Sequence, residues 1–131
     1  MSDKVVRLGG ASGFWGDTPE GARQLVYSGQ VDYLVMDYLA EITMSLLARA
    51  KAKDPAMGYP PDFVAQFIAP YAKEIAARGI KVVCNAGGVN PLACRDAVEK
   101  VLADQGVKLR VAAIVGDDIH DMVEELRGEV K

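Results

Sequence analysis

Four short apolar runs, separated by segments of helical composition, limit the possible folds of this chain more than any other feature. They span 5–8, 33–36, 80–84 and 109–115, and each ends at a glycine or a polar residue. Strands buried in a parallel sheet have such near-continuous apolar runs. The alternation therefore predicts an α/β fold, with a parallel sheet of about four strands and flanking helices joined by right-handed crossovers.

Start and stop signals place helices between these runs. The first is predicted to begin after Asp17 and Thr18 and to end at Gly29. A second, from about Leu39, carries its apolar residues at helical spacing. Its basic residues, Arg49, Lys51 and Lys53, fall on the other side or at its end.

A third helix is predicted after Pro61, kinked or split at Pro70, and a fourth is predicted to open at Pro91. A last helix follows Asp117 and Asp118. Four strands fit either a small doubly wound sheet or part of a larger sheet or barrel.

Length and charge narrow the class of protein. The chain has 131 residues and no internal repeat or linker, which predicts one domain. The sequence has fifteen basic and eighteen acidic residues, and its basic residues form no continuous block. This composition argues against nucleic acid as a partner. No apolar run approaches the roughly 20 residues of a membrane span, so we expect a cytoplasmic protein with no membrane partner. The spacing of Cys84 and Cys94 argues against a disulfide or a metal motif.

Polar, glycine-rich loops follow the predicted strands. In a parallel sheet such loops meet at one edge, so we expect the loops 9–17, 37–41, 85–90 and 116–120 to form a single crevice. The first contains the candidate ligand- or cofactor-binding residues Gly9, Gly10, Ser12, Gly13 and Trp15.

Loop 9–17 leads into a helix N-terminus, which favours an anion such as phosphate or carboxylate. It lacks the spacing of a dinucleotide-binding fingerprint or a P-loop, and a tight turn explains its glycines equally well. Phe14 and Trp15 could stack on a flat ligand or cover the edge of the core.

The other loops supply candidate catalytic and binding residues. Asp37 follows the second run, and Glu41 lies one helical turn further on. The pair could bind a divalent cation or divide acid and base roles, or Asp37 could simply cap the next helix. Asp117 is the third candidate catalytic residue, beside Asp118 and the only histidine, His120, although an N-cap and a solvated histidine would look the same.

Loop 85–90 is a second candidate nest for an anionic group, or alternatively a capping turn. Its candidate binding residues are Asn85, Gly87, Gly88 and Asn90. No specific cofactor or metal is predicted from these loops.

Long ordered segments of the chain resemble a known family. The runs GGASGFWGDTPEGARQLV, DYLVMDYLAEITMSLLARA, YPPDFVAQFIAP and KVVCNAGGVNP are similar to the N-terminal part of the acyclic terpene utilisation (AtuA-like) family. The resemblance spans nearly the whole chain. Positions that match the family's segments include the candidate residues of all four loops, together with Gly16, Asp17, Tyr38, Pro91 and Gly116.

The resemblance implies a catabolic protein that works beside acyl-CoA enzymes. We therefore expect it to bind a small anionic ligand, a carboxylate or an acyl-CoA, with a non-catalytic interaction subunit of an acyl-CoA-metabolising assembly as the alternative. Family members are several times longer. The resemblance thus implies either a piece of a longer protein or a naturally short version, which we expect to associate with itself or with a partner chain.

Overall fold

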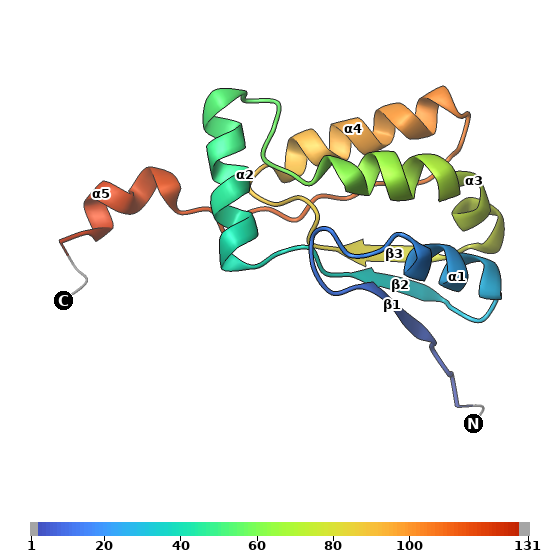
Figure 1. Ribbon diagram of the computed structural model, residues 1–131. Helices are drawn as coiled ribbons and strands as arrows, with labels where there is room; N and C mark the ends of the chain where they lie inside the picture. Colours follow the sequence, from blue (N-terminus) through green and yellow to red (C-terminus); the bar gives the residue numbers. More distant parts are fainter. Residues whose placement is uncertain (1–2, 129–131) are drawn as a thin grey trace.

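Three parallel strands form the centre of the molecule. The computed structural model describes residues 3–128, and its sheet has the order β1 (Leu8–Ser12), β2 (Tyr33–Met36) and β3 (Lys81–Cys84) (Figure 1). The α/β class with a parallel sheet is therefore confirmed, with three strands rather than four.

One face of this sheet is covered by helices. They are α1 (Glu20–Ser28), the π-helical turn η1 (Phe63–Ile68), α3 (Ala69–Arg78) and α4 (Pro91–Asp104) (Figure 1). Helix α2 (Glu41–Lys53) stands across the end of the sheet where the strands finish. The short η2 (His120–Met122) and α5 (Val123–Leu126) project from that end.

The opposite face of the sheet is open. The strands lie in the sheet in the same order as in the sequence. Because each crossover has the same hand, every connection lies on the same side of the sheet. On the covered side Leu34 is fully buried, whereas Val35 and Val83 on the other side are 39% and 55% exposed. Parallel sheets are usually covered on both faces, so this apolar surface is unusual.

A series of packed aromatic rings connects η1 to the end of β2. The ring of Tyr38 meets that of Phe63 edge to face at 5.9 Å, and Phe63 stacks on Phe67 at 5.7 Å. Pairs of this geometry add stability beyond the area that they bury. The start of η1 is thus held over the C-terminal end of the sheet.

The first strand lies further along the chain than predicted. It is Leu8–Ser12 instead of 5–8, so Gly9 and Gly10 belong to the strand and not to a loop. A Cβ at Gly9 would come within 3.0 Å of Val31 and Leu25, which shows how closely α1 and its connection pack on β1. The sequence pattern missed this because glycines were taken as the end of the run.

The fourth predicted strand, 109–115, does not form. This segment returns from the end of α4 toward α5 in the direction of β3 (Figure 1), and Val111 packs against the core. Among the described residues, however, 108–118 take part in no backbone-to-backbone hydrogen bond. Its outward residue Ile114 stays 93% exposed, so apolarity here does not correspond to burial.

The predicted helices are confirmed. Helices α1 and α3 end at Gly29 and Gly79, and α4 opens at Pro91. The helix after Pro61 changes from π to α geometry one residue before Pro70, but the helical run is not split there. In the part of the chain from residue 3 to residue 128, no helix is both long and apolar enough to cross a membrane.

Candidate functional site

The loops after the three strands are tied together at one edge of the sheet. The Trp15 amide donates to the Tyr38 carbonyl at 3.2 Å, and the Tyr38 amide donates to Asn85 Oδ1 at 2.7 Å. These bonds join the loop after β1 to the end of β2, and the end of β2 to the end of β3. The first three predicted loops are therefore joined, whereas the fourth, 116–120, takes no part in these bonds, and the loops line two cavities and not the single crevice that was predicted.

Asp37 lies at the centre of this edge. Its Oδ1 accepts hydrogen bonds from Asn85 Nδ2 at 2.7 Å and from the Leu39 amide at 3.2 Å. Donation by Asn85, and then by the Leu39 amide, lowers the pKa of this exposed carboxyl, which is therefore ionised at neutral pH. The Ser12 hydroxyl donates to the Asp37 carbonyl at 3.2 Å.

The other two candidate catalytic carboxylates are placed differently. Glu41 is exposed in the first turn of α2, and no hydrogen bond of the described residues joins it to Asp37. Asp117 lies in the segment before η2. Across residues 3–128, no three His, Cys, Asp or Glu side chains gather closely enough to hold a metal ion. A shared role for Asp37 and Glu41 stays a prediction.

A cavity of about 280 Å³ opens beside the loop that follows β1, and we call it the first-loop cavity. It lies between that loop, the start of α1, the end of β2 and η1. Its lining consists of Ser12, Phe14, Gly16, Asp17, Thr18, Pro19, Ala22, Met36, Tyr38, Asp62, Gln66 and Phe67. Of the predicted binding residues, only Ser12 lines it.

Hydrogen bonds hold this loop in a fixed shape. The carboxylate of Asp17 accepts the Gly13 amide at 3.0 Å and the Thr18 amide at 2.7 Å. The indole of Trp15 donates to Asp62 Oδ2 at 3.0 Å. Trp15 thus links the loop to the start of η1, and the Gly13 amide is already used within the loop.

Tyr38 separates the first-loop cavity from the core. Burial raises the pKa of its phenol to about 12, so the hydroxyl is a hydrogen-bond donor at neutral pH. No described residue forms a hydrogen bond with this hydroxyl, although every buried polar side-chain atom has a partner. The hydroxyl therefore reaches solvent-accessible space, even though Tyr38 is only 6% exposed.

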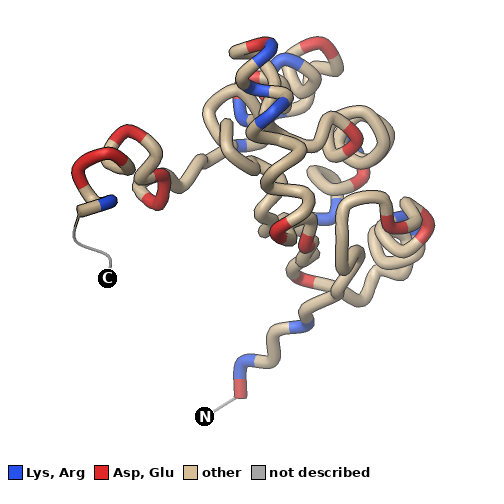
Figure 2. The backbone as a smooth tube through the Cα atoms, turned by 60° about the vertical axis from the view of Figure 1, so that its left-hand side comes forward, with Lys and Arg blue, Asp and Glu red and all other residues tan. Residues whose placement is uncertain are grey.

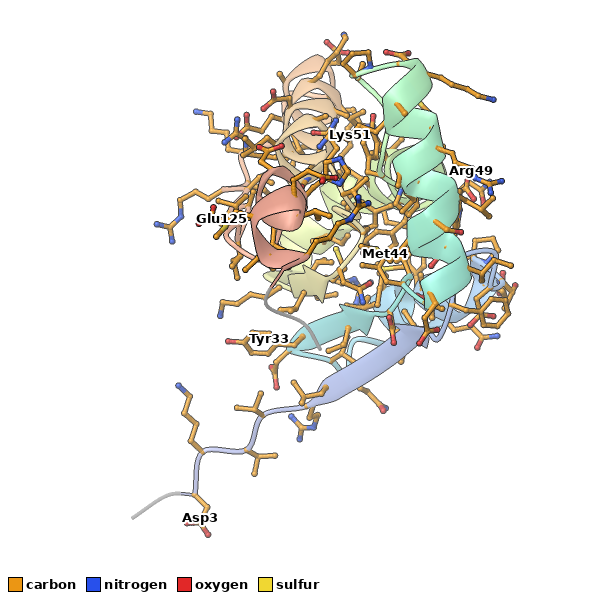
Figure 3. The ribbon with its side chains drawn as sticks, turned by 90° about the vertical axis from the view of Figure 1, so that its left-hand side faces the viewer. Asp3, Tyr33, Met44, Arg49, Lys51 and Glu125 are labelled. Carbon is orange, nitrogen blue, oxygen red and sulfur yellow. The ribbon has the colours of Figure 1, made fainter. Side chains whose placement is uncertain are left out.

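A second cavity, of about 490 Å³, lies between α2, the loop after β3 and the segment that leads to α5. We call it the Lys51 cavity. Its lining consists of Met44, Lys51, Gly88, Val89, Asn90, Pro91, Leu92, Val115, Gly116, Asp117, Asp118, Ile119, His120 and Val123. In Figure 3, Met44 and Lys51 lie on the side of α2 that faces α4 and α5, whereas Arg49 lies on the other side.

The loop after β3 is a tightly packed wall of the Lys51 cavity. Gly88 has a φ of +55°, and a Cβ there would lie 2.5 Å from the Gly58 carbonyl and 2.7 Å from Leu47 Cδ1. Only glycine fits such a contact with this backbone conformation. The amides of Gly88, Val89 and Asn90 all donate to backbone carbonyls, so they are not free for an anion.

The N-terminus of α4 borders the same cavity, which Pro91 and Leu92 help to line. Asn90 occupies the N-cap position, but its side-chain amide donates to the carbonyls of Pro55 and Met57 at 2.9 and 2.7 Å. No side chain caps α4. The amides of Leu92 and Ala93 are therefore left at the positive end of a fourteen-residue helix.

Charged side chains of both signs face this cavity. The ammonium of Lys51 donates to the Val89 carbonyl at 2.7 Å, which fixes it at the mouth of the loop. Across the cavity lie Asp117, Asp118 and His120, where Asp118 Oδ1 accepts the His120 amide at 2.9 Å. Figure 2 shows that acidic residues continue along α5.

Among the lining residues that were not predicted as site residues are Lys51, Asp62 and Gln66. Lys51 was assigned to the solvated side or the end of its helix, yet it is half-buried. Asp62 and Gln66 fall in the helix predicted after Pro61 and were not singled out. A signal for Asp62 was its place directly after Pro60 and Pro61, where a polar residue begins a helix.

Neither cysteine is suited to nucleophilic chemistry. Both are free thiols. Burial raises the pKa of Cys84, and it raises that of Cys94 to about 12, so both stay protonated at neutral pH. They are therefore structural, as the sequence indicated.

Comparison with known proteins gives one result. The model of the family described as acyclic terpene utilisation family protein AtuA matches residues 6–131. No curated protein and no solved structure matches the chain.

Proposed function

The chain belongs to the acyclic terpene utilisation family AtuA, and from this membership we propose that it binds an anionic small molecule of terpene catabolism, a carboxylate or an acyl-CoA, in the Lys51 cavity. Family membership itself supports a role related to terpene utilisation. The class of the ligand and its binding in the Lys51 cavity are the parts that need testing.

The observation that carries the proposal is the pairing of Lys51 with the uncapped N-terminus of α4 in one cavity. A fixed ammonium and free helix amides favour a carboxylate or a phosphate. Apolar side chains complete the lining, among them Met44, Leu92 and Ile119. An anionic head and an apolar chain could therefore be accommodated together.

The size of the cavity is that of a small-molecule site. A volume of about 490 Å³ falls within the roughly 300–1,000 Å³ of small-molecule sites. Asp117, Asp118 and His120 lie opposite Lys51, where they could exchange protons with a bound ligand. Asp117 thus keeps its proposed catalytic role, while Asp37 and Glu41 lie outside the lining of this cavity.

The test is a thermal-shift and calorimetry series. A branched terpenoid carboxylate, its coenzyme A thioester and the corresponding alcohol are titrated into the chain and into Lys51→Met. At a hundred times its Kd, a ligand adds about 2.7 kcal/mol to the free energy of unfolding. Because a charge-assisted hydrogen bond contributes about 1.5–3 kcal/mol, Lys51→Met should raise the Kd of the carboxylate at least about tenfold.

Lys53→Met, at the exposed end of the same helix, is the matched control and should bind as the unaltered chain does. Equal affinity of Lys51→Met and Lys53→Met for the carboxylate would reject the site. A preference for the alcohol over both anions would reject the ligand class.

The uncovered face of the sheet favours a second candidate, an interaction subunit. Leu8, Val35 and Val83 expose apolar surface on adjacent strands of a parallel sheet. We expect a second copy or a partner chain to cover it. Sedimentation at micromolar concentration should then give a discrete oligomer that Val83→Lys dissociates, and a stable monomer would count against this role.

A further inference from the structure

Residues 108–128 are attached to the rest of the molecule by side-chain packing alone. Val111 packs against the core. Among the described residues, however, no hydrogen bond and no ion pair joins this segment to residues 3–107, because all of its bonds are local. Every residue from 114 to 122 is exposed, and η2 and α5 contain no buried residue. The part of the segment beyond Val111 is therefore weakly held.

Gly116 divides this segment at the edge of the Lys51 cavity. Its φ is +125°, which L side chains rarely adopt, and no other residue from 107 to 128 has a positive φ. No atom lies within 4 Å of the place that its Cβ would take, so it is the backbone conformation that requires a glycine here. Such a residue can absorb the rotation of a hinge. The residues beyond it, 117–126, project from the body of the molecule (Figure 1), and we call them the arm.

The arm and the body present matching groups to the Lys51 cavity. Ile119 on the arm is 55% exposed, and Leu92, on the α4 side of the cavity, is 48% exposed. Asp117 on the arm lines the same cavity as Lys51. A closer approach of the arm would bury the apolar pair and bring the opposite charges together. Both changes are energetically favourable.

From these observations we propose that the arm is a lid, which turns about Gly116 and closes the Lys51 cavity. In the closed state Ile119 packs on Leu92, and Asp117 approaches Lys51. A lid of this kind excludes water from a bound ligand and brings the side chains of the arm to it. The purpose of the lid rests on the proposed function, whereas its motion does not require a ligand.

Cysteine pairs across the cavity test the closure without a ligand. One chain carries Leu92→Cys with Ile119→Cys. The control carries Leu92→Cys with Met122→Cys, because Met122 is a similarly exposed residue of the arm that does not line the cavity. Disulfide formation with oxidised glutathione is followed by mass spectrometry, and burial raises the pKa of Cys84 and Cys94, so these native thiols react slowly. Since a disulfide needs Cα atoms within about 7 Å, the Ile119 pair should form at least about fivefold faster.

Further variants, each made in the first of these two chains, test the hinge and the charges. Gly116→Ala should slow disulfide formation at least about fivefold, because a side chain strains the backbone at this φ. Gly106→Ala, at a φ of +67° and outside the arm, is the matched control and should leave the rate unchanged. Lys51→Met should slow the reaction about twofold to fivefold, the range for an exposed ion pair, while Lys53→Met should not.

Four results would overturn the proposal. They are equal rates for the Ile119 and Met122 pairs, a disulfide formed mainly between two chains, equal rates for Gly116→Ala and Gly106→Ala, and equal rates for Lys51→Met and Lys53→Met. The second result would place the arm on another copy of the chain. Calorimetry with the terpenoid carboxylate decides the proposed function separately, since a chain that binds no carboxylate can still close its lid.

Discussion

The first-loop cavity and the Lys51 cavity open at the same edge of the sheet but have opposite chemical character. One is lined by two carboxylates and aromatic rings without a basic side chain, and the other combines a lysine with an uncapped helix N-terminus. In the first, the helix start is accompanied by Asp17, whose carboxylate accepts two backbone amides. In the second, Asn90 is turned away toward Pro55 and Met57.

This contrast shows that a glycine-rich loop before a helix does not by itself make an anion site. The free donors of such a loop depend on where its capping side chain goes. Asp17 accepts two amides of the loop that follows β1, whereas the side-chain amide of Asn90 holds the turn after α2. Neither α1 nor α4 has a side-chain cap, so it is the charge of the lining side chains, two carboxylates in one cavity and Lys51 in the other, that separates the two cases.

The largest expected effect is on the wall of the Lys51 cavity. Gly88→Ala should lower the free energy of unfolding by roughly 2–4 kcal/mol, because its Cβ would overlap the Gly58 carbonyl at a positive φ. Urea unfolding measures the loss. Gly10→Ala is the control, since no atom lies within 4 Å of its Cβ position, and it should change stability by less than about 1 kcal/mol.

Equal stability of Gly88→Ala and Gly10→Ala would refute the close contact with Gly58.

A smaller effect is expected at Asn85, which ties the ends of β2 and β3. Asn85→Ala leaves the Tyr38 amide without its acceptor and should cost about 1–3 kcal/mol. It also removes the main donor that lowers the pKa of Asp37, so the titration midpoint of Asp37 in NMR should move upward toward its usual value.

The sign of the pH dependence follows from that lowered pKa. The interaction stabilises the folded state above the pKa that Asp37 has in the unfolded chain, and it is lost as the pH falls through the lower folded value. Acid unfolding should therefore be less steep in Asn85→Ala. An unchanged Asp37 midpoint in the variant would contradict the assignment.

The smallest effect is expected at Tyr38. At neutral pH Tyr38→Phe should alter the free energy of unfolding by no more than about 1 kcal/mol, because no described residue bonds the lost hydroxyl. Since the folded pKa is about 12 against an ordinary 10, the unaltered chain should lose stability as the pH rises from 10 to about 12. Tyr38→Phe should lack that alkaline loss, as followed by circular dichroism, and an equal loss in both chains would place the titrating group elsewhere.

The elements of the fold were largely predictable from local patterns. Apolar runs located β2 and β3, and the glycines and prolines at 29, 61, 79 and 91 marked helix ends, because these residues restrict the backbone wherever they occur. The meeting of the loops at one edge followed from parallel strands alone. The prediction of a strand at 109–115 was wrong. An apolar run can pair only where a neighbouring strand is free to bond it, and that is a property of the whole sheet.

The sequence by itself determined the strand and helix order, the family and the set of polar residues near the strand ends. Only the tertiary structure decided which of these residues share a cavity. Lys51 was placed on the other side or at the end of its helix, because periodicity records the face of one helix and not what lies opposite it. Whether a side chain such as that of Asn90 or Tyr38 has a partner depends on atoms far away in the chain, which no local pattern contains.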